Sequence, residues 1–228
     1  MDLGQIDRLL DPAPMPLEMG YERLDSGVLH VALRTDMHHC TGAMFEWWFR
    51  FRPQTREYLW WHPIDHVSSE WSEGSEGTHI GAIHLVEEAF TNDPPIKLAI
   101  QLRDPGEIFD AATLTAARAA GTVSAIIVGH GGPGHQPPRA PDGTVMGGRM
   151  VHLARDTTWG MVLRTHFFLG QDLIKLGMPR DQIIDLFPKS HGANLLQHGY
   201  DEFTWLSRFL PSLYIAENRA TVPVVRPW

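Results

Sequence analysis

A long helical pattern near the C-terminus constrains the fold more than any other feature of this sequence. From Ser190 to about Arg219, residues placed about 100° apart put apolar side chains on one narrow stripe, which predicts a helix packed against a core. We expect Pro211 to kink this helix near its end. The stripe also contains an imidazole and a carboxyl group. Its members are Leu195, His198, Glu202, Leu206, Phe209 and Leu213.

The segments before this helix have the patterns of antiparallel strands. HIGAIHLVEEAF and IKLAIQL, joined by a turn at residues 92–95, predict one hairpin, and RMVHLARD with WGMVLRTHFFLG predicts a second. TVSAIIVG and GVLHVALR are further strand candidates, and Thr41 is a suitable N-cap for a helix AMFEWWFRF. Strands followed by one long amphipathic helix predict an α+β fold in which a curved sheet wraps the helix.

We expect one domain over residues 41–228, preceded by an N-terminal extension over residues 1–40. A glycine- and proline-rich segment, Gly129–Gly143, is expected to form a loop at the rim or lid of a pocket. It lacks the lysine and the Ser/Thr of a phosphate-binding loop, and prolines replace the helix that should follow.

Composition excludes some classes of partner. The chain of 228 residues has a formal net charge of -8 and no run of Lys or Arg, which argues against nucleic acid and anionic membranes as ligands. A single cysteine, Cys40, excludes an internal disulfide framework, and the first residues lack the blocks of a signal peptide, so we expect a cytoplasmic protein. No apolar stretch has the roughly 20 residues that a membrane span needs. Small molecules are therefore the expected ligands.

The polar pair on the helical stripe needs compensation, because a buried carboxylate without a partner costs several kcal/mol. His198 and Glu202 could form a local ion pair, could join a network with Arg or Tyr from the sheet, or could bind a divalent metal. His66 is a further candidate ligand. Only one of Glu87 and Glu88 can face the helix, since strand side chains alternate. Two histidines and two carboxylates would suit zinc.

Several segments together resemble the family of 2,4-diacetylphloroglucinol hydrolase and phloretin hydrolase. They are TGAMFEWWFRF, YLWWHPIDH, VEEAF, RDPGEIFD, VHLARDTTWGMVLRTHFFLG and HGYDEFTWLSRFLPSLY, and the resemblance extends from about Met37 to Tyr214. It implies a helix-grip fold similar to Bet v 1 and START-like domains. It also implies one Zn²⁺ ion, a homodimer, and hydrolysis of the carbon-carbon bond between an acyl group and a polyhydroxylated aromatic ring.

The resemblance assigns roles to individual residues. The first family ligand follows a tyrosine by eight positions, which matches Tyr58 and His66 rather than His62, and the strand ligand matches Glu88, with Glu87 as the alternative. Tyr58 would contact a ring hydroxyl or the acyl oxygen of the substrate. The implied metal ligands are His66, Glu88, His198 and Glu202, and the implied acid/base residue is His152.

The expected substrate is a small aromatic ketone, either 2,4-diacetylphloroglucinol or a related acylphloroglucinol. Trp47, Trp48, Trp60 and Trp61 could stack on its flat ring. The family has a second tyrosine on the strand after the acid/base histidine, whereas residues 159–168 contain none, so the substitution pattern of the substrate is open. Two alternatives remain: a non-catalytic helix-grip protein that encloses a hydrophobic ligand, and a zinc hydrolase that acts on another phenolic compound.

Overall fold

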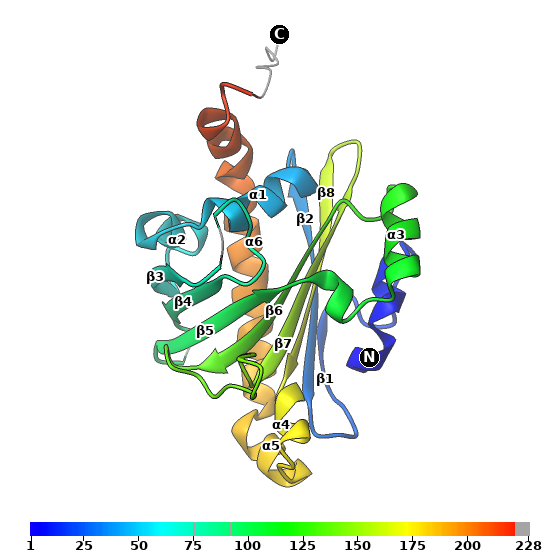
Figure 1. The fold of residues 1–228 in the computed structure, drawn as a ribbon, viewed down its shortest axis with the longest axis vertical. Helices are drawn as coiled ribbons and strands as arrows, with labels where there is room; N and C mark the ends of the chain where they lie inside the picture. Colours follow the sequence, from blue (N-terminus) through cyan, green and yellow to red (C-terminus); the bar gives the residue numbers. More distant parts are fainter. Residues whose placement is uncertain (75, 92, 222–228) are drawn as a thin grey trace.

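The computed structural model describes residues 1–74, 76–91 and 93–221, and its centre is one eight-stranded antiparallel sheet (Figure 1). The strand order is β1-β2-β8-β7-β6-β5-β4-β3. The strands are β1 (Gly20–Arg23), β2 (Leu29–His38), β3 (His66–Ser72), β4 (Ile83–Glu88), β5 (Ile96–Arg103), β6 (Ala125–Pro133), β7 (Gly148–Asp156) and β8 (Gly160–Leu169). The helices are η1 (Leu3–Leu10), α1 (Gly42–Phe51), α2 (Thr55–Trp61), η2 (Pro105–Glu107), α3 (Ala111–Ala119), α4 (Gln171–Lys175), α5 (Arg180–Leu186) and α6 (Lys189–Glu217).

The long helix α6 packs along one face of the sheet, as the stripe predicts (Figure 1). Its path lies close to the sheet because Gly199 has no side chain: a Cβ there would lie 3.1 Å from Leu33 Cδ2. Pro211 lies inside the helix and frees the carbonyl of Ser207, four residues earlier, which receives the thiol of Cys40 at 3.8 Å. The buried side of α6 consists of Gly192, Leu195, His198, Gly199, Glu202, Phe203, Leu206 and Leu210.

The sheet is buried on both faces. Toward α6, the inward residues of β6 and β7, such as Ile127 and Met150, join the cluster around Phe203 and Leu206. On the opposite face, the alternate residues of the same strands pack against η1 and α3. An antiparallel sheet that carries one long C-terminal helix is the predicted α+β helix-grip arrangement, and this prediction is confirmed.

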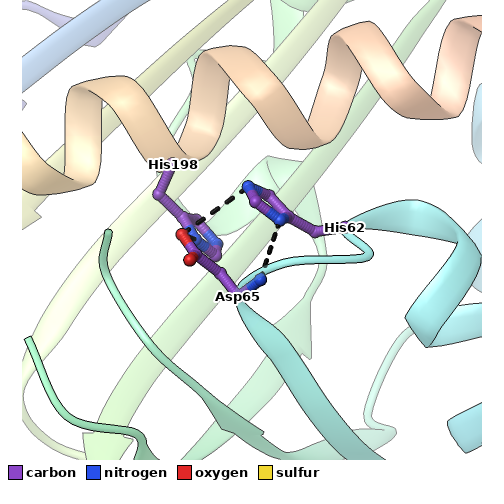
Figure 2. Close-up of side chains that lie close together, drawn as sticks. All are labelled: His62, Asp65 and His198. Carbon is purple, nitrogen blue, oxygen red and sulfur yellow. Dashed lines mark hydrogen bonds and ion pairs between the residues drawn. The ribbon is translucent and has the colours of Figure 1, made fainter. Parts of the chain in front are cut away.

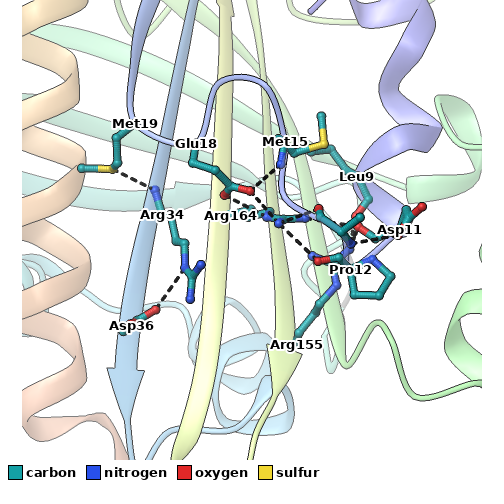
Figure 3. Close-up of polar contacts among 11 residues, drawn as sticks. Leu9, Asp11, Pro12, Met15, Glu18, Met19, Arg34, Asp36, Arg155 and Arg164 are labelled. Atoms are coloured by element: carbon teal, nitrogen blue, oxygen red, sulfur yellow. Dashed lines mark hydrogen bonds and ion pairs between the residues drawn. The ribbon is translucent and has the colours of Figure 1, made fainter.

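The N-terminal segment is attached to the outer face by two buried arginines. Arg164 of β8 donates to Ala13 O at 2.9 Å and to Glu18 Oε1 at 2.7 Å, and Arg155 of β7 donates to the carbonyl of Asp11 at 3.0 Å (Figure 3). Residues 1–40, predicted as an extension, also contain β1 and β2, and β2 pairs with β8 along its whole length. The division of the chain at residue 40 stays a prediction.

Most local predictions agree with the structure, and one does not. The Thr41 hydroxyl accepts from the Met44 amide at 3.3 Å and caps α1, and both predicted hairpins form, as β4–β5 and β7–β8. The segment Gly129–Gly143, which the sequence predicts to be a loop, continues β6 over its first five residues to Pro133 because β5 supplies their hydrogen-bonding partners. None of the helices within the described residues combines the length and apolar content needed to cross a membrane.

Candidate metal centre

Four buried side chains converge between the β3–β4 end of the sheet and α6. His66 begins β3, Glu88 ends β4, and His198 and Glu202 lie one turn apart on α6. His66 Nε2 lies 3.5 Å from Glu202 Oε2 and 3.7 Å from Glu88 Oε2. His198 Nε2 lies 3.8 Å from the same Glu202 oxygen. These separations are long for hydrogen bonds, so the four groups face one another without closing a direct network.

A β-bulge places the two strand residues opposite each other. Ser68 pairs with Glu87 in the regular register, which would set His66 against Ala89, but the register shifts between His66 and Ser68. His66 therefore pairs with Glu88, and directly paired residues point to the same face of the sheet. Glu88 shares this buried face with His84 and Val86, whereas Glu87 is only partly buried. The structure thus places Glu88, and not Glu87, beside the helix.

Hydrogen bonds fix the orientation of both imidazole rings. His66 Nδ1 lies 2.9 Å from the carbonyl of Tyr58, and His198 Nδ1 lies 3.0 Å from Asp65 Oδ2. Because each partner is an acceptor, each Nδ1 carries the hydrogen, and in the neutral ring, which is the form that binds a metal, each Nε2 keeps a free lone pair. In the described part of the chain His66 Nε2 is buried and has no hydrogen-bonding partner. Both lone pairs are therefore available to a cation.

The donor set fits zinc. Neutral imidazole nitrogen and carboxylate oxygen are common zinc ligands, and the outer nitrogen of a ligating histidine usually donates to a carbonyl or carboxylate. Four ligands at about 2.0–2.2 Å in a tetrahedron lie about 3.3–3.6 Å apart, close to the observed spacings of 3.5–3.8 Å. The atoms of His66, His198 and Glu202 lie within 4.8 Å of one another. These residues could hold a metal ion.

The electrostatics of the group also favour a bound cation. Burial raises the pKa of Glu202 to about 8; the nearby His198 opposes this shift and the neighbouring Glu88 adds to it. Burial likewise raises the pKa of Glu88 and holds the pKa of His66 well below its usual value. Burial lowers the pKa of His198, but its bond to Asp65 and the nearby glutamates outweigh this and leave the pKa raised. Two carboxyl groups buried together favour positive charge beside them, which a divalent cation would provide in place of protons.

A second group, His62, Asp65 and His198, adjoins the first (Figure 2). The backbone amide of Asp65 donates to His62 Nδ1 at 3.0 Å, so His62 carries its hydrogen on Nε2. Its ring stacks on His198, with centroids 4.8 Å apart. Since Asp65 already binds His198 Nδ1, His62 and Asp65 support the candidate ligand His198 and do not form a second set of free donors. Sequence reasoning set His62 aside and missed Asp65, although both lie in the segment YLWWHPIDH that ends with His66.

Tyr58 was predicted to contact the substrate, and the structure shows it engaged with two members of the group. Its ring stacks on His66 with centroids 3.6 Å apart, and its hydroxyl donates to Glu88 Oε2. Burial and Glu88 raise the pKa of Tyr58 well above its usual value, so the hydroxyl stays protonated. Tyr58 therefore orients His66 and Glu88, and its role toward a substrate stays a prediction.

His152 lies on the inner face of β7 among aromatic rings. Its centroid is 5.0 Å from that of Phe203, the residue after Glu202, and its Nδ1 lies 2.8 Å from the Thr165 hydroxyl. Burial lowers the pKa of His152 to about 3, so the imidazole is neutral near pH 7 rather than poised near 6.5. A neutral imidazole can accept a proton. In the predicted acid/base role, His152 would therefore act first as a base.

The four tryptophans expected at the site have different positions. Trp61 is buried, and its ring meets His66 edge-on at 5.6 Å. Trp48 is buried behind Trp61, with centroids 5.5 Å apart. Trp47 is partly buried and stacks on Phe51, and Trp60 is 44% exposed. Trp61 is therefore the one of the four whose ring contacts a candidate ligand.

Comparison with known proteins now identifies the family. Residues 1–215 match the family model described as "DAPG hydrolase PhiG domain". The chain belongs to this family. Two curated relatives, from Pseudomonas sp and from Pseudomonas protegens, are both named 2,4-diacetylphloroglucinol hydrolase. Each is 27% identical over 235 residues, which cover 93% of this chain and 76% or 72% of the relative. The resemblance drawn from the sequence is confirmed.

Solved structures of similar shape share little sequence with the chain. Ara h 8.0201 has a TM-score of 0.47 and 13% identity, and the match covers 81% of this chain and 99% of that one. Protein Ms6760 from Mycobacterium smegmatis has a TM-score of 0.40 and 8% identity, with 90% and 98% covered.

Proposed function

We propose that this protein is a zinc-dependent hydrolase that cleaves the carbon-carbon bond between an acyl group and a polyhydroxylated aromatic ring. Its substrate would be 2,4-diacetylphloroglucinol or a related acylphloroglucinol, and one product a carboxylic acid. The observation that carries the proposal is the set of four converging side chains, in which both histidines are anchored through Nδ1. The names of the two curated relatives support the substrate class.

His66, Glu88, His198 and Glu202 would hold the ion. When bound, zinc supplies a positive charge that polarises a carbonyl and lowers the pKa of a coordinated water from 15.7 toward ~7. The protein contributes the fixed geometry of the ligands. Tyr58 holds Glu88 and the ring of His66, and Asp65 holds His198, so the donors are oriented before an ion arrives.

The proposed reaction needs a proton on the ring carbon that loses its acyl group. A hydroxyl beside that carbon can give up its proton and become a ketone as the carbon is protonated, and the acyl group is then part of a β-diketone. Water adds to the acyl carbonyl, the carbon-carbon bond breaks, and its electron pair returns to the ring as an enolate that becomes the phenol. The products are the deacylated ring and a carboxylic acid, so the atoms balance.

We assign the proton movement to His152. As a neutral base it would take the proton of the ring hydroxyl and return it to the ring carbon, and the Thr165 hydroxyl at Nδ1 holds the ring in place. The aromatic residues around it, Phe49 and Phe203 among them, would exclude bulk water from the ketone intermediate. This role requires no charged imidazolium in the unliganded protein.

Incubation of the zinc-loaded protein with a panel of acylphloroglucinols and other phenolic esters and ketones tests the proposal. Release of carboxylic acid from an acylphloroglucinol is expected for the wild type and for the control His191→Ala, which replaces a partly buried histidine in the first turn of α6, two turns before His198. His152→Ala should retain zinc and lose turnover by about 10²–10⁴-fold. If the zinc-loaded protein binds acylphloroglucinols and leaves them intact, it is a ligand-binding protein. If it releases acid only from other phenolic compounds, those compounds are its substrate class.

A further inference from the structure

Asp65 ties three segments of the chain together beside the candidate metal centre. Its Oδ2 accepts from His198 Nδ1 on α6 at 3.0 Å and from the Thr91 amide after β4 at 3.0 Å. Its backbone carbonyl accepts from the Ala89 amide at 2.8 Å. The residue is 3% exposed and directly precedes His66. One buried aspartate therefore connects the start of β3, the end of β4 and the long helix.

The direction of these bonds determines which nitrogen of His198 is free. An ionised carboxylate only accepts hydrogen bonds, so His198 must present N–H to Asp65, and the neutral ring therefore has its lone pair on the other side. A second donor, the backbone amide of Thr91, binds the same Asp65 oxygen and helps hold the carboxylate in place. His62 stacks on the His198 ring at 4.8 Å, and its Nε2 lies 3.6 Å from Asp65 Oδ2, which limits ring motion on that side.

We propose that Asp65 is a positioning residue that fixes the tautomer and ring orientation of His198 and thereby sets the affinity of the centre for its metal. This inference rests on the proposed function, because it requires that His198 bind zinc through Nε2. Partners of this kind typically change metal affinity by 10–100-fold when they are replaced. Asp65 would act through His198 and touch neither the metal nor the substrate.

Two substitutions separate the charge from the hydrogen bonds. In Asp65→Asn the amide oxygen can still accept from His198 and Thr91 but carries no full charge, and we expect zinc affinity to fall by about 10-fold. In Asp65→Ala both bonds are lost, and we expect a fall of about 100-fold. Zinc affinity would be measured by competition with a chromophoric chelator on metal-free protein, with Zn²⁺ alone as the probe.

Asp93→Asn is the matched control. Asp93 Oδ2 accepts from Asn194 Nδ2 on the same helix at 2.9 Å, so it also links the β4–β5 connection to α6, and among the described residues its side chain has no hydrogen bond or ion pair with a candidate ligand. Zinc affinity of this variant should stay within about two-fold of the wild type. The visible spectrum of the Co²⁺-loaded proteins provides a second readout, which should change for both Asp65 variants and not for the control.

The outcomes distinguish the inference from the proposed function. A folded Asp65→Ala protein that binds zinc within two-fold of the wild type and keeps the wild-type Co²⁺ spectrum would overturn the role of Asp65 and leave the zinc site standing. A wild-type protein that binds no zinc would remove the proposed function itself. If Asp65→Ala does not fold, the zinc affinity of Asp65→Asn is the test. A purely structural role predicts that Asp65→Asn has lower thermal stability but that its folded form binds zinc as tightly as the wild type.

Discussion

Replacing His152 with leucine should weaken the dependence of stability on pH. Burial holds the pKa of His152 at about 3, against about 6.5 in an unfolded chain. Between these values the unfolded chain binds a proton that the folded protein does not. The contribution of neutral His152 to the free energy of unfolding is therefore fully present above pH ~6.5 and is lost as the pH falls toward 3. From pH 7 to pH 5 the linkage amounts to about 2 kcal/mol of unfolding free energy.

Urea unfolding at pH 7 and pH 5 measures this effect. The wild type should lose about 2 kcal/mol more than His152→Leu between the two pH values. At pH 7 the variant should itself be about 1 kcal/mol less stable, because the Thr165 hydroxyl loses its partner. His84 and His166, whose pKa values burial also lowers to about 3, are present in both proteins and cancel. Equal pH dependence of the two proteins would refute a neutral, buried His152.

Two further predictions concern the geometry of the ligands. Tyr58→Phe keeps the ring against His66 but removes the hydroxyl bond to Glu88. Zinc affinity, measured by chelator competition, should fall by about 10-fold, and the circular dichroism spectrum should stay that of the wild type. Glu88→Gln removes the buried carboxylate that pairs with His66 and should lower zinc affinity by at least about 100-fold, whereas Glu87→Gln, at the partly buried neighbouring position, should stay within about two-fold of the wild type; equal effects of the two substitutions would contradict the assignment of Glu88.

The helix and its polar pair could be predicted from the sequence because a single periodicity determines them. The apolar stripe placed His198 and Glu202 on the buried side of α6, and alternation along the strand placed Glu88 with His84 and Val86. The stripe was imperfect at its end: Leu210 is fully buried, whereas Phe209 is only partly buried. These inferences depended on residues close together in the chain.

Features that depend on distant pairing could not be predicted in the same way. The contact between His66 and Glu88 requires a one-residue shift at the bulge, and an alternating pattern does not show such a shift. The bond between Asp65 and His198 joins residues 133 positions apart. The layer of η1 and α3 on the outer face was also missed, although consecutive residues of β6 such as Ile126 and Ile127 are both apolar, as expected for a strand covered on both sides.

The zinc content of the purified protein tests the central claim most directly. After equilibration with Zn²⁺ and removal of the excess, elemental analysis should find one ion per wild-type chain and one per chain of the control His191→Ala. His198→Ala and Glu202→Ala, if folded, should retain almost none. A folded wild type without zinc, or full zinc content in folded His198→Ala and Glu202→Ala, would contradict the account.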